Sequence, residues 1–291
     1  MKEDVASILS DVYSEAITIK SAQSSAGGSI NQAQVLLLSN GEKVFLKSNP
    51  CPPENFFARE AKGLTALAQA DTGMRVPKVL ALDTAPNPHF IILERLEEVP
   101  PNGGYYQRFG QMLAKLHQTS QEKFGFDHDN FIGSTWQINA LESDGLYFFR
   151  EHRIRYQQKL ARSAEKLPTR LDKRLDQLCD KLGSLLNLGT ERPALLHGDL
   201  WSGNHFPSSG QTPCMFDPAV YYGPREADLA MTELFGGMPE TFYSAYREAF
   251  PLDPGYHERK KIYNLYHLLN HLNLFGDAYL VSVEATVNQF I

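Results

Sequence analysis

Hydrophobic positions recur at two spacings along the chain, and they separate a strand-rich first third from a helical remainder. Apolar residues at helical spacing predict an opening amphipathic helix, carried by Val5, Ile8, Leu9 and Val12. Asn40-Gly41 then lies between two apolar runs, which is the strongest short-range signal for a β-hairpin. The sequence therefore predicts antiparallel strands over 34–39 and 43–48.

The first third contains one more predicted helix and two further strands. The helix is indicated by apolar residues three or four apart, at Phe57, Ala61, Leu64 and Leu67. Apolar runs over 76–82 and 90–93 predict the strands, with a Pro-rich turn between them. The segment that follows, RLEEVPPNGGYY, is rich in Pro and Gly, so we expect a hinge at about 94–104.

After the hinge the hydrophobic pattern is helical. It predicts helices around 109–116, 148–160, 171–185 and 265–275. We therefore expect an α+β protein of two lobes. The first lobe, residues 1–95, is a small antiparallel β-sheet with a helix, and the second, residues 96–291, is larger and mostly helical.

Composition narrows the class of protein. The 291 residues are 42% hydrophobic and 21% charged, as in ordinary globular proteins. The net charge of −6 and the lack of a basic run argue against a nucleic-acid partner. The three cysteines form no CxxC pair, and no stretch has the apolar length of a signal peptide or a membrane span. We expect a reduced, cytoplasmic protein with no membrane partner.

A dense polar block interrupts the helical part, beginning with LLHGDLWSGN at 195–204. Asp199 and Asn204 follow one short apolar segment, and Asp217 follows another. We expect all three on loops that flank short strands, a favoured position for functional residues. Two carboxylates and an amide are hard oxygen ligands, which suit Mg²⁺.

The first lobe supplies matching parts for a phosphate site. Gly27, Gly28 and Ser29 precede the first predicted strand, and a glycine-rich turn lets phosphates approach the backbone. Lys47 ends the next strand, and Glu60 on the following helix could hold it as an ion pair. The order of these parts, followed by Asp199, Asn204 and Asp217, is that of the protein-kinase-like phosphotransferases.

Three motifs carry a closer resemblance. LLHGDLWSGN, FDPAVYYGPREADLAMTELFGG and YNLYHLLNHLNLFG resemble the fructosamine kinase/ketosamine-3-kinase family, and GGSINQA and FLK fit its N-terminal lobe. The related aminoglycoside and choline kinases share the HGD…N and Asp skeleton, but they usually lack Trp after HGDL. The resemblance implies a protein-kinase-like fold and ATP-dependent phosphorylation of the 3-hydroxyl of a ketosamine, free or on a glycated protein. Such enzymes act in deglycation repair.

The resemblance also implies roles for individual residues. Asp199 would accept the proton of the sugar hydroxyl, although an unperturbed aspartate, with a pKa of about 3.9, is a weak base. Asn204 and Asp217 would hold Mg²⁺, and Trp201 would pack on the sugar. The remaining residues would bind ATP: Gly27, Gly28 and Ser29 over the phosphates, Lys47 with its partner Glu60, and Glu94, Arg95 and Leu96 at the adenine edge.

Other residues of these motifs have expected supporting roles. We expect His197 to brace the catalytic loop, and Asp228 to begin a helix and hydrogen-bond the backbone of that loop. For Arg225 and Glu226, a solvated ion pair on the surface is as good an interpretation as a role in the site. Some family members carry a cysteine in the glycine-rich loop that supports redox-linked dimerisation. Ser29 stands there, so we expect no such switch.

Two other functions compete with this interpretation. One is an aminoglycoside or choline kinase, against which Trp201 and the DPAVYYGPREADLAM block count. The other is a catalytically inactive kinase-like protein that only binds nucleotide or a partner. Lys47, Asp199 and Asp217 are all present, which counts against the inactive protein. The sequence indicates no oligomeric state.

Overall fold

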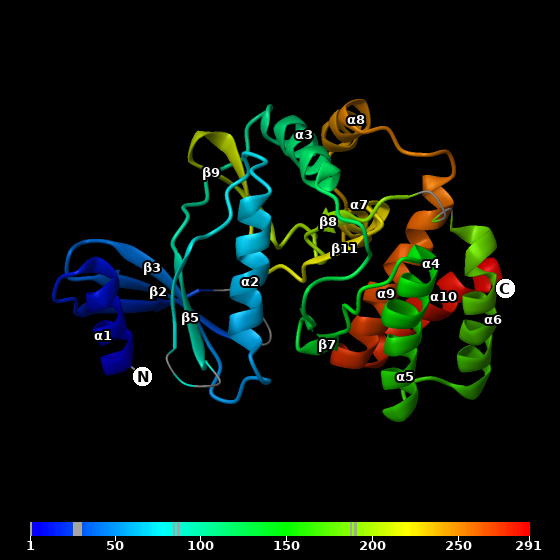
Figure 1. Ribbon diagram of the computed structural model, residues 1–291, viewed down its shortest axis with the longest axis horizontal. Coiled ribbons are helices and arrows are strands. Elements are labelled where there is room, and N and C mark those ends of the chain that lie inside the picture. The colour runs from blue at the N-terminus through cyan, green and yellow to red at the C-terminus, as the bar shows by residue number, and fades with distance from the viewer. Residues whose placement is uncertain (1, 26–30, 84, 86–87, 187, 189–190) are drawn as a thin grey trace.

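A computed structural model describes residues 2–25, 31–83, 85, 88–186, 188 and 191–291. Among these, a five-stranded antiparallel sheet is followed by a mostly helical part (Figure 1). The sheet has the strand order β1-β2-β3-β5-β4. Its strands are β1 (Ile19–Ser24), β2 (Gln32–Leu38), β3 (Lys43–Ser48), β4 (Val79–Leu82) and β5 (Phe90–Glu94).

The predicted hairpin is confirmed, with β2 paired to β3 across the Asn40-Gly41 turn. Strand β1 was not predicted, because IKSAQS is polar and mostly exposed and so shows no apolar alternation. The strand predicted over 76–82 begins only at Val79, and Arg75, which precedes the predicted strand, forms an isolated bridge with Cys214.

Each face of the sheet is covered by one helix. Leu46 and Ile92 pack against α1 (Lys2–Tyr13), while Ile91 and Leu93 pack against α2 (Phe56–Gln69). Successive side chains of a strand point to opposite faces. Lys47 therefore points to the α2 face of the sheet. Helix α2 lies between the sheet and the helical part (Figure 1).

Eight α-helices follow β5 in the described part of the chain. They are α3 (Tyr105–Gln118), α4 (Gly145–Phe149), α5 (Tyr156–Ser163), α6 (Thr169–Leu185), α7 (Glu226–Leu234), α8 (Glu240–Ala249), α9 (Tyr256–Phe275) and α10 (Leu280–Phe290). The helix predicted over 148–160 is divided among α4, a π-helical turn (Arg150–Arg155) and α5. Helices α8 and α10 were not predicted.

Close packing fixes α3 against α8. A Cβ on Gly110 of α3 would lie 2.2 Å from the carbonyl oxygen of Phe242 on α8, so only glycine allows this approach. Helix α9 is buried along most of its length and packs on α7, α5 and α10. These helices pack together in the part of the chain that contains the polar block.

Short two-stranded ladders connect these helices. Strand β8 (Ala194–Leu196) pairs with β11 (Tyr221–Gly223), β9 (His205–Ser208) with β10 (Thr212–Met215), and β6 (Asn130–Ile132) with β7 (Thr135–Gln137). Asp199, Asn204 and Asp217 lie in the loops beside β8, β9 and β10, as predicted. The division of the chain near residue 95 stays a prediction. In the described part of the chain, no helix has the length and apolar character to cross a membrane.

Candidate active site

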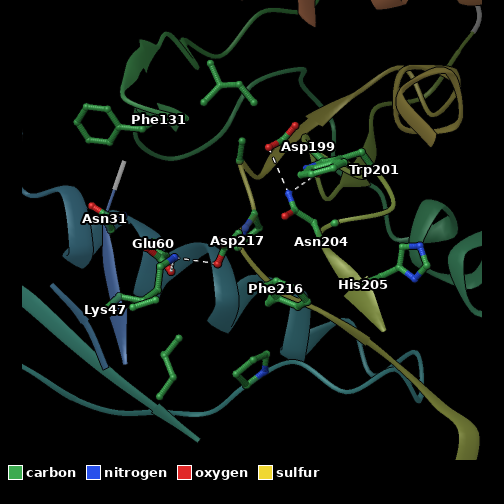
Figure 2. A pocket seen from close by; sticks show the side chains of 18 of the residues that line it. Asn31, Lys47, Glu60, Phe131, Asp199, Trp201, Asn204, His205, Phe216 and Asp217 are labelled. Atoms are coloured by element: carbon green, nitrogen blue, oxygen red, sulfur yellow. Dashed lines mark hydrogen bonds and ion pairs between the residues drawn. The ribbon is translucent and has the colours of Figure 1, made fainter. Parts of the chain in front are cut away.

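A cleft of about 680 Å³ separates the sheet and α2 from the loops of the polar block. Figure 2 shows Lys47 and Glu60 on one side of Asp217, and Asp199, Trp201 and Asn204 on the other. The cleft therefore brings together Lys47 and Asp217, which are 170 positions apart in sequence. Gly27, Gly28 and Ser29 lie outside the described residues, so their phosphate contacts and the expected absence of a redox switch stay predictions.

Lys47 forms the ion pair with Glu60 that the sequence predicted, at 2.6 Å from Nζ to Oε1. Its Nζ also lies 2.8 Å from Oδ1 of Asp217, a contact that was not predicted. Burial opposes the charge of Lys47, but Asp217 and Glu60 outweigh it and raise the pKa of the ammonium. Burial raises the pKa of Glu60, and Lys47 opposes that rise. Lys47 thus carries a positive charge at the centre of the cleft.

The backbone at the catalytic loop is tightly constrained. Gly198 has a φ of +84°, and a Cβ there would lie 2.0 Å from the carbonyl oxygen of Ala219. Asp217 adopts a φ of 55°, which non-glycine residues seldom adopt. Such strain persists only where the surroundings enforce it, and it is common at functional sites.

Two hydrogen-bonded side chains hold this loop. The ring Nε2 of His197 lies 2.9 Å from the carbonyl oxygen of Phe216, and this contact confirms the bracing role. Asp228 in α7 accepts the backbone N–H groups of His197 at 2.7 Å and Gly198 at 2.8 Å. The predicted contact between Asp228 and the loop backbone is confirmed. His117 of α3 in turn contacts Asp228 at 3.3 Å.

Asp199 and Asn204 are coupled across the loop. The amide Nδ2 of Asn204 donates to the backbone oxygen of Asp199 at 2.8 Å and to its Oδ2 at 3.3 Å. This arrangement leaves the side-chain oxygen of Asn204 available as a ligand. Burial, with the charge of Asp217, raises the pKa of Asp199 to about 7. Asp199 is therefore a stronger base than the unperturbed aspartate assumed from sequence.

Trp201 is not a core residue. Its side chain lines the cleft and is 37% exposed, with its ring edge-to-face with Phe235 at 6.1 Å between centroids. Other residues that line the cleft are Asn130, Phe131, Ile132, Gly133, Ser202, Gly203, Asn270, His271, Leu274 and Phe275. We call this group the acceptor half. None of its members is acidic.

The other end of the cleft lies at the end of β5. Glu94, Arg95 and Leu96 line it, together with Phe206 and Phe216, whose rings are 5.3 Å apart. The N–H of Glu94 already donates to the carbonyl of Lys78 at 2.8 Å, so it is not free for an adenine edge. Phe206 and Phe216 were not predicted, although each lies within two positions of Asn204 or Asp217.

Arg225 and Glu226 do not form a solvated pair, and that interpretation is wrong. Glu226 is buried, and Arg259 of α9 contacts both of its oxygens, at 2.6 and 2.7 Å. The guanidinium of Arg225 lies over the ring of Phe250 at 3.7 Å and donates to the carbonyl of that residue. Both side chains therefore pack α7 against its neighbours.

Comparison with known proteins places this site in a family. The fructosamine kinase family model matches residues 1–291. A probable ketoamine kinase of Vibrio parahaemolyticus is 44% identical over 271 residues, which cover 91% of each chain. A chloroplastic protein-ribulosamine 3-kinase of Arabidopsis thaliana is 36% identical, over 95% of this chain and 84% of the relative.

Solved structures agree with the fold. A structure described as a putative fructosamine-3-kinase from Haemophilus somnus superposes with a TM-score of 0.89 at 28% identity, covering 100% of this chain and 98% of that one. An aminoglycoside phosphotransferase superposes with a TM-score of 0.65 at 15% identity, covering 98% and 99%. The second likeness shows the fold alone.

The fold and the site thus define a protein-kinase-like phosphotransferase, and the predicted fold class is confirmed. The chain belongs to the fructosamine kinase family, as the three sequence motifs indicated. It is a kinase.

Proposed function

We propose that this kinase transfers the γ-phosphoryl group of ATP to the 3-hydroxyl of a ketosamine, free or on a glycated protein. The observation that carries the proposal is the HGDLWSGN loop, which presents Asp199 and Trp201 to one cleft, facing Lys47. The names of the relatives, ketoamine kinase and protein-ribulosamine 3-kinase, support this acceptor class. Phosphorylation would make the adduct unstable and release the amine, so the reaction serves deglycation repair.

The donor set of the cleft fits Mg²⁺. Asn204 and Asp217 offer an amide oxygen and a carboxylate, and Lys47 contacts only one carboxylate oxygen of Asp217. A bound Mg²⁺ would neutralise charge on the ATP phosphates. Lys47 would contact these phosphates, with Glu60 fixing the position of its ammonium. The adenine would be received by Glu94, Arg95 and Leu96, together with the rings of Phe206 and Phe216.

Asp199 would receive the proton of the attacking hydroxyl. Its raised pKa improves this transfer, but most catalysis in phosphoryl transfer comes from positioning and charge neutralisation. Trp201 would pack its ring on the C–H face of the sugar and attract the adjacent ammonium of the substrate.

The acceptor half separates this proposal from an aminoglycoside kinase. A polycationic acceptor is favoured by a cleft lined with carboxylates. The carboxylates that line this cleft are Glu60, Glu94, Glu98, Asp199 and Asp217, and none of them belongs to the acceptor half. We infer that the acceptor half is suited to an acceptor with at most a small positive charge.

An acceptor panel with ATP and Mg²⁺ tests the proposal, using a ribulosamine, a fructosamine, choline and kanamycin, with Asp199→Ala as the blank. We expect turnover on the ketosamines alone, lowered at least about 100-fold in the blank. Turnover only on choline or kanamycin would overturn the acceptor assignment. Nucleotide binding without turnover on any acceptor would favour the inactive binding protein.

A further inference from the structure

Hairpin β6–β7 contacts helix α2 across the cleft. The guanidinium of Arg59 on α2 lies over the ring of Trp136 on β7, 4.6 Å from its centroid. The Nη1 of Arg59 also donates to the carbonyl of Asp129, just before β6. Phe56 at the start of α2 packs on Phe131 with 5.0 Å between ring centroids. The hairpin therefore contacts the helix that carries Glu60.

The same hairpin is fixed to the segment that follows Asp217. Asn130 on β6 donates to the carbonyl of Val220 at 2.7 Å, and Gln137 on β7 donates to the carbonyl of Ala219 at 3.0 Å. Both amide side chains are buried, where a hydrogen bond is costly to lose. Phe131 and Trp136 face one another across the ladder, with ring centroids 5.2 Å apart. The hairpin is thus a firm support and not a free loop.

Arg59 directly precedes Glu60, whose carboxylate holds Lys47 at 2.6 Å. A small displacement of α2 at Arg59 would move Glu60 away from Lys47, because both residues lie on the first turns of the same helix. The hairpin also supplies Asn130, Phe131, Ile132 and Gly133 to the acceptor half. A ligand seated there would press on the element that holds α2.

We propose that hairpin β6–β7 couples the acceptor half of the cleft to the Lys47–Glu60 pair, with Arg59 and Trp136 as positioning residues. The nucleotide part of this proposal rests on the kinase fold, and only its acceptor part rests on the proposed function. An effector that changes affinity at a second site has a reciprocal effect, so the coupling is measurable from either ligand.

The nucleotide part is tested by the dissociation constant of magnesium AMP-PNP, measured calorimetrically without acceptor. We expect Arg59→Met and Trp136→Leu each to weaken binding about fivefold or more, and Trp136→Phe to retain most of the affinity because a ring remains under the cation. If Arg59 acts through Glu60, the double variant Arg59→Met/Glu60→Gln binds no more weakly than Glu60→Gln alone.

The matched control is Tyr147→Leu. It removes an exposed ring 5.9 Å from the guanidinium of Arg150, a pair that lies wholly within the helical part, and it should leave the affinity unchanged. Thermal unfolding of each variant shows that it is folded. If Trp136→Leu does not fold, Arg59→Met and Arg59→Lys carry the test.

Additive losses in the double variant would overturn the nucleotide part, as would an Arg59→Met effect that Trp136→Leu does not reproduce. Additive losses would mean that Arg59 does not act through Glu60, and the second result would mean that it does not act through the ring of Trp136.

For the acceptor part, we expect ribulosyl-lysine to tighten AMP-PNP binding in the wild type and to lose that effect in Trp136→Leu. A wild type that phosphorylates ribulosyl-lysine with no change in AMP-PNP affinity would overturn the coupling. Failure to phosphorylate any ketosamine would overturn the proposed function, while the nucleotide cycle still decides the role of Arg59.

Discussion

Two residues at the cleft, Gly198 and Asp217, have backbone conformations that fix the direction of the side chains around them. Gly198 permits a left-handed turn beside Ala219, and Asp217 adopts a left-handed conformation without being glycine. The two turns set the directions of Asp199 and of the Asp217 carboxylate. The positions of the two carboxylates therefore depend on the φ angles of Gly198 and Asp217.

Gly198→Ala should therefore be among the most damaging single substitutions. The added Cβ would have to displace the backbone of Ala219, and the positive φ adds strain, so we expect a loss of about 2–4 kcal/mol in unfolding free energy. We also expect turnover to fall at least about 100-fold. Chemical denaturation and steady-state kinetics measure the two effects.

Gly41→Ala is the control, since Gly41 has a similar φ but nothing lies within 4 Å of a Cβ placed there. Equal stability of both variants would show that the contact with Ala219 is not the cause.

Helices in this protein supply side chains that position residues of a loop and of a strand. Helix α7 contributes Asp228 to the catalytic loop, and α2 contributes Glu60 to Lys47. Asp228 is buried, with burial raising its pKa, but hydrogen bonds and the nearby His117 and His197 outweigh that and lower it. The carboxylate of Asp228 stays charged because the N–H groups of His197 and Gly198 and the ring of His117 hydrogen-bond to it.

Asp228→Ala tests the support that α7 gives. It would leave the N–H groups of His197 and Gly198 buried without an acceptor, which costs about 1–3 kcal/mol for each group. We expect a lower unfolding free energy together with a lower kcat, because the loop that carries Asp199 loses its anchor. Exposed Glu248→Ala on α8 is the control. A variant with wild-type kcat would show that the loop holds its conformation without α7.

At the scale of the whole molecule, six histidines share one property: burial lowers the pKa of each. The pKa falls to about 4 for His205 and to about 3 for His267, and it is also lowered for His117, His128, His197 and His271. In the unfolded chain these rings would take up a proton near pH 6.5. They therefore stabilise the fold above that pH, and this contribution is lost as the pH falls.

His267→Gln should flatten the acid limb of the stability curve. Between pH 6 and pH 4 the unfolded state binds a proton at His267 that the folded state does not, so the wild type loses about 1.4 kcal/mol per pH unit from this group. We expect the slope of unfolding free energy against pH to fall by about that amount in the variant. Urea denaturation at several pH values measures it. An unchanged slope would mean that His267 is protonated in the folded protein.

Local sequence patterns predicted much of the fold because tight turns and amphipathic helices are determined by residues close together in the chain. The Asn40-Gly41 turn fixed the β2–β3 hairpin, and apolar spacing located α2, α3, α6 and α9. Strand β1 escaped prediction because its residues are polar on both faces, so its pairing with β2 provides the only signal. The π-helical turn at Arg150–Arg155 has no pattern of its own in the sequence, and its Arg153 is buried with the guanidinium over the ring of Tyr221.

The sequence by itself determined the residue types of the cleft, their order and the Lys47–Glu60 ion pair, because motif spacing and helix and strand periodicity are local properties. Only the tertiary structure decided which distant groups meet. It brought Asp217 to 2.8 Å from Lys47, buried Asp199 enough to raise its pKa to about 7, and paired Glu226 with Arg259. Contact distance and burial are properties of packed surfaces from several segments, and no single stretch of sequence carries them.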